Sequence, residues 1–285
     1  INLSMKIIYT PEGKKHKDND VSPSLLYLFR NNYKAYLSLV YTLFSRDFKS
    51  KYKQSILGII WVFVLPILTT LMFVLLNIAG VLNFEEIDVP YVVFGLFGIT
   101  FWSVFSSGVS LTSGSLINAG SMVVKINFPK SALVFAASCI CIVELLIRLP
   151  FLIILLIYFN IDFDLLVLIK VFLMIIPLYT IALAVGFTLS ICAGVLRDIV
   201  ISLPIVVNAF MMLTPVMYPI QEKSFLGQIN QWNPLNYLVN VPRDFLLFNK
   251  EVPFQYYLLL IFIPVLLILS VRFFYISQTK ITERI

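Results

Sequence analysis

Long apolar runs alternate with short polar segments along most of the chain. The runs cover about 56–77, 90–111, 131–159, 165–193, 199–217 and 254–275. A helix needs about 20 mainly apolar residues to cross the hydrocarbon core of a bilayer. The pattern therefore predicts an all-α integral membrane fold, with six transmembrane helices in a domain of residues 56–276 and a cytoplasmic tail at 277–285.

The chain before the first run divides into two parts. Residues 1–21 are polar and charged and predict a cytoplasmic tail, and the Ser-Pro pair that follows is typical of a helix start. Residues 22–55 predict a helix whose apolar side chains recur every three or four positions, at Tyr33, Leu37, Val40, Phe44, Phe48 and Tyr52. Arg46, Lys49 and Lys53 project from roughly the opposite side. We expect an amphipathic helix in the cytoplasmic interface, or alternatively a helix packed on a partner protein.

Residues 218–252 differ from the rest of the chain because they mix polar and aromatic positions with several prolines. They are too broken to span a membrane and apolar enough to dip into one. We expect short re-entrant or interfacial helices on the outer side, between the fifth and sixth spans. An ordinary external loop is the alternative.

Composition and charge agree with a membrane protein. Sixty per cent of the residues are apolar, 13% are charged, and the mean hydropathy is +0.94, which excludes an ordinary soluble domain. The net charge of +6 arises mainly before residue 55, beside the first apolar run. Because cytoplasmic segments of membrane proteins are enriched in Lys and Arg, both termini are expected in the cytoplasm. The bases then face a membrane surface, and nucleic acid is not expected as a partner.

The sequence offers little catalytic chemistry of its own. The 3 cysteines lie inside apolar runs, and the single histidine lies near the N-terminus, so neither a disulfide framework nor a metal site is expected. A Gly-rich phosphate loop with its Lys-Ser/Thr ending is absent from the sequence. The chain is therefore not expected to be an enzyme or to hold a cofactor, and any ATP and Mg²⁺ would be bound by a partner chain.

Three sets of residues could nonetheless carry function. Glu144 and Arg148 stand four positions apart inside the third apolar run, where a lone charge is costly, so they predict an ion pair, either structural or on a translocation route. The second run carries aromatic residues, most of them on one helical face: Tyr91, Phe94, Phe97, Phe101, Trp102 and Phe105. These could line a conduit for sugar rings or simply pack. The segment 112–130 ends in Lys125, Phe128, Pro129 and Lys130, and could be a plain loop or an element that a cytoplasmic motor pushes.

Several motifs together resemble the ABC-2 permeases of O-antigen, capsule and teichoic-acid exporters. They are Arg46-Asp47, then Tyr52-Lys53-x-Ser55-x-Leu57-Gly58-x-x-Trp61 with Pro66, then Lys125-Ile-Asn-Phe128-Pro129, Arg197-Asp198, Thr214-Pro215-Val-Met-Tyr218-Pro219, and Asn233-Pro234-Leu235 followed by Arg243. Each motif alone is weak. Their order and spacing match the family from about residue 30 to the last run.

The resemblance implies a homodimer that assembles with two copies of an ABC ATPase subunit in the bacterial cytoplasmic (inner) membrane. An undecaprenyl-linked polysaccharide would leave the cytoplasm through a channel lined by the aromatics listed above, and membrane lipids would be further partners of the chain. Arg46, Lys49, Tyr52, Lys53 and Trp61 would admit this substrate, and Lys125, Phe128, Pro129 and Lys130 would contact the ATPase. Tyr218, Trp232, Asn233, Pro234 and Arg243 would belong to an outer gate. The alternatives are an ABC-2 exporter of drugs or lipids, or a membrane glycan polymerase or ligase.

Overall fold

The computed structural model describes residues 8–10, 13–15, 25–53, 56–80, 88–120, 122, 128–219 and 225–281, with side chains from residue 33 to residue 278 within these ranges. The chain forms two compact units, residues 1–39 and 40–285. The first unit holds two short antiparallel strands, β1 (Ile8–Thr10) and β2 (Gly13–Lys15), and the beginning of α1 (Leu25–Lys53). These strands lie where the sequence predicted only a polar tail.

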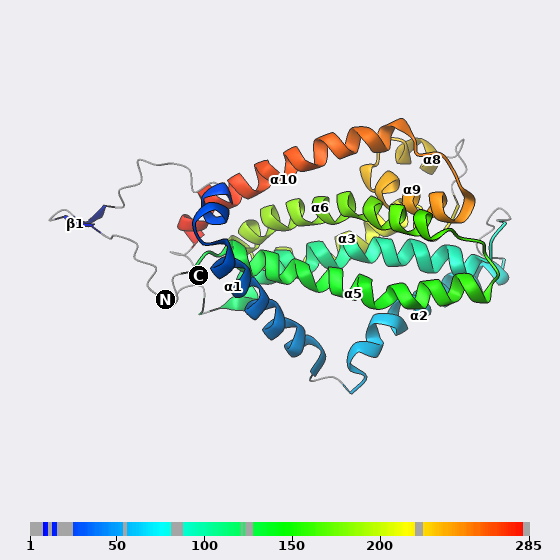
Figure 1. The fold of residues 1–285 in the computed structure, drawn as a ribbon, viewed down its shortest axis with the longest axis horizontal. Coiled ribbons are helices and arrows are strands. Elements are labelled where there is room, and N and C mark those ends of the chain that lie inside the picture. The colour runs from blue at the N-terminus through cyan, green and yellow to red at the C-terminus, as the bar shows by residue number, and fades with distance from the viewer. Residues whose placement is uncertain are drawn as a thin grey trace. The chain divides into compact units, whose positions relative to one another are not determined.

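All regular secondary structure among the described residues of the second unit is helical. It holds the end of α1, a 3-10 turn at Gly58–Ile60, and the helices α2 (Trp61–Ile78), α3 (Tyr91–Ala119), α5 (Ser131–Tyr158), α6 (Leu165–Val195), α7 (Asp198–Leu213), α8 (Phe225–Asn230), α9 (Pro234–Phe248) and α10 (Phe254–Ile281) (Figure 1). Each predicted apolar run became a helix. The segment 218–252 contains two short helices, α8 and α9.

Five helices in the described part of the chain are long and apolar enough to cross a membrane: 58–78, α3, α5, α6 and 254–278 of α10. The protein is therefore a multi-pass membrane protein. The fifth predicted span is the shorter α7, of 16 residues, which extends about 24 Å against a hydrocarbon core of about 30 Å. The six-span plan thus stays a prediction.

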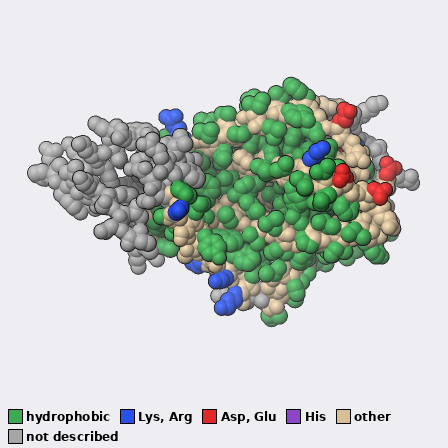
Figure 2. Space-filling model, viewed as in Figure 1, with side chains coloured by type: hydrophobic (Ala, Val, Ile, Leu, Met, Phe, Trp, Pro, Cys, Tyr) green, Lys and Arg blue, Asp and Glu red, His purple; other side chains and the backbone are tan. Residues whose placement is uncertain are grey.

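Side chains on the surface fit this assignment. Figure 2 shows hydrophobic side chains over most of the visible face of the helices, with acidic side chains gathered at one end. Large apolar side chains on α2 and α10 are exposed, for example Met72 at 61% and Ile261 at 67%. Such a surface is stable only against lipid or another protein.

The central helix of the second unit is α3, which packs mainly against α5 and α6. It continues to Ala119, so the first part of the predicted polar segment 112–130 is helical. The hydroxyl groups there are satisfied locally, because Thr112 Oγ1 donates to the Gly108 carbonyl at 2.6 Å and Ser115 Oγ to the Thr112 carbonyl at 2.7 Å. A buried helix can therefore carry them at little cost.

Candidate functional site

The end of α1 is joined to the middle of α5 through one buried carboxylate. Lys51 Nζ lies 2.5 Å from Glu144 Oε1, and the Tyr52 hydroxyl donates to the same oxygen at 2.5 Å. The side chain of Glu144 is 6% exposed and that of Lys51 is 38% exposed. A buried carboxylate needs a counter-charge and hydrogen bonds, and both come here from two successive residues of α1.

Arg148, one turn further along α5, has different partners from those predicted. Its Nε donates to the Val62 carbonyl at 2.9 Å and its Nη1 to Ser103 Oγ. Within the described residues no salt bridge joins it to Glu144, so the predicted pairing of these two is wrong. The reason lies in α2: Pro66 has no N–H to donate to the carbonyl four residues earlier, and Arg148 bonds that carbonyl instead.

These contacts form what we call the α5 polar cluster, composed of Lys51, Tyr52, Ser103, Glu144 and Arg148. Through it, α5 is bonded to α1, to the start of α2 and to the middle of α3. Burial and the hydrogen bond to Glu144 raise the pKa of the Tyr52 phenol above its ordinary value, so that this donor keeps its proton to a higher pH than a free phenol does. A displacement of α1 would therefore be transmitted to α5 and, through it, to α2 and α3.

Sequence reasoning missed Lys51 and Ser103. Lys51 departs from the basic side of the predicted amphipathic helix and falls toward its apolar stripe, a deviation that could have marked it as the partner of a buried acid. Ser103 lies on α3 and carried no signal of its own. The proline at position 66 was the available clue to Arg148, since it leaves one carbonyl of α2 without a helical partner.

The other residues predicted to admit substrate do not converge on this cluster. Arg46 Nε pairs with Asp47 Oδ1 at 2.7 Å, and its Nη1 lies 3.3 Å from Met122 Sδ, in the segment before α5. Lys49 and Lys53 are exposed on α1, and Trp61 is 41% exposed at the start of α2. Only Tyr52 of the predicted set belongs to the cluster.

The predicted ATPase-coupling segment is described only in part. Lys125 lies outside the described residues. Phe128, Pro129 and Lys130 directly precede α5 and are half-buried, and burial lowers the pKa of Lys130 below its ordinary value. The Arg46–Met122 contact brings α1 to this same segment of the chain.

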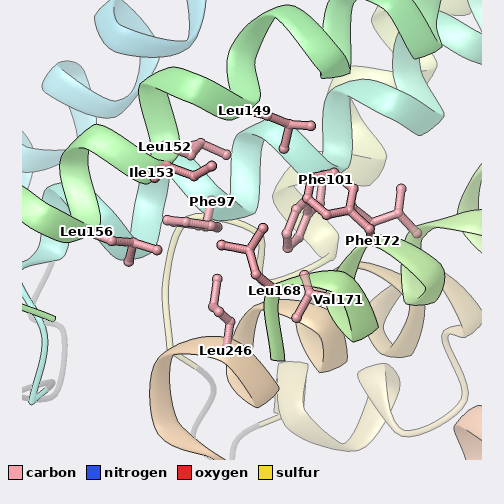
Figure 3. A pocket seen from close by; sticks show the side chains of 11 residues that line it. Phe97, Phe101, Leu149, Leu152, Ile153, Leu156, Leu168, Val171, Phe172 and Leu246 are labelled. Atoms are coloured by element: carbon pink, nitrogen blue, oxygen red, sulfur yellow. The ribbon is translucent and has the colours of Figure 1, made fainter. Parts of the chain in front are cut away.

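The aromatic residues of α3 are core residues in this structure. Phe94, Phe97, Phe101, Trp102 and Phe105 are each at most 8% exposed, and Tyr91, which is half-buried, donates its hydroxyl to the Met217 carbonyl. An apolar cavity beside Phe97 and Phe101 measures about 20 Å³, room for about one water molecule. Figure 3 shows it closed in by side chains from α3, α5, α6 and α9. The rings do not line an open channel, which corrects the conduit prediction for this conformation.

Close packing around Arg243 holds the predicted outer segment against α3. The guanidinium of Arg243, a residue that is 3% exposed on α9, donates from Nη1 to the Val216 carbonyl at 3.0 Å. It also pairs with Asp244 at 2.9 Å and lies 3.7 Å above the ring of Phe94. A Cβ at Gly98 would overlap the Val216 carbonyl oxygen, so glycine is what lets the chain after α7 lie directly on α3.

The remaining predicted gate residues frame α9. Asn233 is its N-cap, accepting from Leu235 N at 3.0 Å, and Pro234 occupies the first turn. The Tyr218 hydroxyl donates to the Met212 carbonyl at 2.7 Å, and Trp232 is 89% exposed. α8 and α9 are therefore ordered helices; their re-entrant placement stays a prediction.

The architecture and the sites together define a polytopic helical membrane protein. Its apolar helices are connected by hydrogen bonds and ion pairs of a few buried charged residues. A family model described as ABC-2 type transporter matches residues 38–247, and the chain belongs to this family. It is thus a transporter component. It is also similar to the O-antigen export system permease protein RfbA of Myxococcus xanthus, at 26% identity over 210 residues, which is 70% of this chain and 76% of that protein.

Proposed function

We propose that this chain is the membrane subunit of an exporter that moves a lipid-linked polysaccharide of the O-antigen type out of the cytoplasm. The observation that carries the proposal is its similarity to an O-antigen export permease across 70% of the chain. The motifs around Tyr52–Trp61 and Asn233–Leu235 add support because they resemble polysaccharide exporters in particular. No feature described above favours a drug or lipid exporter.

Energy for transport would come from separate subunits. The sequence has no phosphate-binding loop, so ATP and Mg²⁺ would be bound and hydrolysed by two ABC ATPase subunits docked on a homodimer of this chain. The docking surface would include α1 and the segment that contains Phe128, Pro129 and Lys130. Support comes from the contact between Arg46 and Met122, which joins α1 to the chain between α3 and α5.

The α5 polar cluster gives this scheme a mechanical link. ATP binding would draw the ATPase subunits together and shift α1. Because Lys51 and Tyr52 hold Glu144, and Arg148 holds the Val62 carbonyl and Ser103, α5 would carry the shift to α2 and α3. A passage would then open between protomers, and repeated cycles would advance the glycan.

The orientation proposed is with both termini in the cytoplasm and the protein in the inner membrane. In that orientation the exposed cations of α1, Lys49 and Lys53, lie at the cytoplasmic surface. Their positive charge suits the phosphate groups of an undecaprenyl carrier, and the exposed Trp61 suits the level of the lipid headgroups. These three residues would help to admit the substrate from the membrane.

The test combines purification with a gene deletion. The chain is co-expressed with the ABC ATPase encoded beside it and purified in detergent through a tag on this chain alone; co-elution of the ATPase in equal amounts is expected. Deletion of the gene should leave complete polysaccharide inside the cell, and a plasmid copy should restore it to the surface. Absence of polymer altogether would instead indicate a polymerase, and unchanged surface glycan would exclude polysaccharide export.

A further inference from the structure

A cleft of about 1060 Å³ lies between the turn after α7, the helices α8 and α9, and the start of α10. It is at least as large as most sites for small ligands, which measure about 300–1,000 Å³. It differs from the apolar cavity beside α3 because amide, aromatic and charged side chains line it together. The α5 polar cluster does not contribute to it.

Asparagine amides form one wall of the cleft. Asn236 Nδ2 donates to the Asn230 carbonyl at 3.1 Å, and Asn240 Nδ2 donates to Asn236 Oδ1 at 2.7 Å. Asn240 is only 8% exposed, yet its Oδ1 has no hydrogen-bond partner among the described residues. That oxygen is sealed from the cleft, so Asn240 acts by holding Asn236 Oδ1 in place, and the half-buried Asn236 is the amide available to a ligand. Hydroxyl groups are donors and acceptors in one, and they suit such a wall.

Aromatic rings also line the cleft. Trp232 is 89% exposed, so its ring is almost uncovered by the rest of the described protein. Tyr237 is held at its edge by a hydrogen bond from its hydroxyl to the Gln231 carbonyl at 2.8 Å. Anchored in this way, a ring presents a flat apolar face, which suits the C–H face of a sugar ring without reading the pattern of its hydroxyls.

The charged residues of the cleft discriminate against anions. Among its described lining residues are the three carboxylates of Asp88, Asp244 and Glu251 and the two bases Arg243 and Lys250. Both bases are engaged by one carboxylate, since Arg243 and Lys250 lie 2.9 Å and 3.4 Å from Asp244. Neither Asp88 nor Glu251 has an ion-pair partner among the described residues. A polyanion would meet uncompensated negative charge here.

We propose that this cleft binds sugar units of a neutral or amino-bearing glycan chain, stacked on Trp232 and hydrogen-bonded to the amide of Asn236. The proposal rests on the proposed export function and adds to it a substrate class: hydroxyl-rich glycans without a high density of carboxylate or phosphate. In the proposed orientation the cleft lies on the outer side, where it holds the chain that has emerged and hinders its return.

The experiment measures glycan binding to the detergent-purified complex of this chain and its ATPase. The probes are dextran, mannan, chito-oligosaccharides and polygalacturonate, followed by tryptophan fluorescence and calorimetry. Trp232→Ala removes the stacking surface, and Asn236→Leu removes part of the amide wall. The matched control is Phe225→Ala, since Phe225 is 77% exposed on the neighbouring α8 and does not line the cleft.

Neutral or amino glycans should bind the unsubstituted complex and polygalacturonate should not. Trp232→Ala should weaken binding about tenfold, in line with the loss of one aromatic contact, and Phe225→Ala should leave it unchanged. The inference would be overturned if none of the probes bound or if polygalacturonate were preferred. It would also be overturned if Trp232→Ala and Asn236→Leu bound the glycans as tightly as the unsubstituted complex does. If the deletion strain still accumulated polymer, the export proposal would stand even though the glycan-binding inference had failed. The deletion experiment therefore distinguishes a failure of one from a failure of the other.

Discussion

Lys51 Nζ and Glu144 Oε1 are 2.5 Å apart, a contact between residues 93 positions distant in sequence that joins the end of α1 to the middle of α5. No helical spacing relates these two residues, so the contact arises from the packing of α1 on α5. The pair places a positive charge from a surface helix over a carboxylate that is almost fully buried. Together with the hydrogen bond from Tyr52 to the same oxygen, it links α1 directly to a membrane helix.

Removal of the Lys51 charge should therefore destabilise the protein. Lys51→Gln leaves Glu144 buried with only the Tyr52 hydroxyl, and a buried charged group without its partner costs about 1–3 kcal/mol or more. A lower midpoint of thermal unfolding in detergent is expected. The double variant Lys51→Gln/Glu144→Gln should regain much of the loss, and Lys49→Gln, on the exposed side of α1, should stay near the unsubstituted protein. No recovery in the double variant would exclude the ion pair as the cause.

Tyr52 should give this contact a distinct pH dependence. Its pKa in the folded protein is raised above the ordinary value of 10.0 by burial and by the hydrogen bond to Glu144. A phenol with a raised folded pKa stabilises the fold fully below the unfolded pKa, and the contribution is lost as pH rises from there toward the folded pKa.

The difference in thermal midpoint between the unsubstituted protein and Tyr52→Phe should thus stay constant from pH 7 to pH 9 and shrink above about pH 10. The comparison cancels the titration of tyrosines and lysines that lie away from the α5 polar cluster. Thermal unfolding at closely spaced pH values measures it. A difference that does not change through pH 11 would show that Tyr52 does not keep a protonated bond to Glu144.

Gly98 should resist even the smallest substitution. A Cβ at this position would overlap the backbone carbonyl of Val216, and backbone cannot move aside as a flexible side chain can. We expect Gly98→Ala to lower the yield of folded protein and to cost about 1–3 kcal/mol. Gly114→Ala is the control, because the nearest atom to its Cβ is the movable end of the Asn118 side chain, at 3.2 Å. Equal stability of both variants would contradict this packing.

The same geometry changes how an export defect at Gly98 should be interpreted. From sequence, a bulky residue at Gly98 would be expected to obstruct a polymer path along the aromatic face of the second span. In the structure that face is filled by protein, with Phe94 and Phe97 at most 4% exposed. Loss of export in such a variant would therefore report a damaged junction between α3 and Val216.

The helices themselves were largely predictable from the sequence. The third apolar run was predicted at 131–159 and the helix covers Ser131–Tyr158, because hydropathy and the flanking polar residues set both ends. The start of α9 was not predicted, although it follows a local signal, since Asn233 and Pro234 are a strong N-cap and first-turn pair and act as such. Local sequence signals decide these features.

The partners of the buried charges were not predictable in the same way. A spacing of four residues indicated a pair between Glu144 and Arg148, yet each side chain found a partner from a distant element. Periodicity likewise showed that the aromatic residues of α3 share a face, but it cannot say whether protein, lipid or a channel covers that face. These outcomes depend on how the helices pack, which no local pattern encodes.

Arg243 should tolerate replacement by lysine poorly. Its guanidinium simultaneously bonds the Val216 carbonyl and Asp244 and lies 3.7 Å over Phe94, and a lysine ammonium cannot reproduce this flat, forked geometry. Arg243→Lys should unfold at a clearly lower temperature, with a loss of about 1–3 kcal/mol because the buried Val216 carbonyl loses its donor. Lys250→Gln provides the control: its side chain is 63% exposed and also faces Asp244, so at most about 1 kcal/mol is expected. If Arg243→Lys and Lys250→Gln unfold at the same temperature, the buried guanidinium of Arg243 does not hold the outer segment on α3.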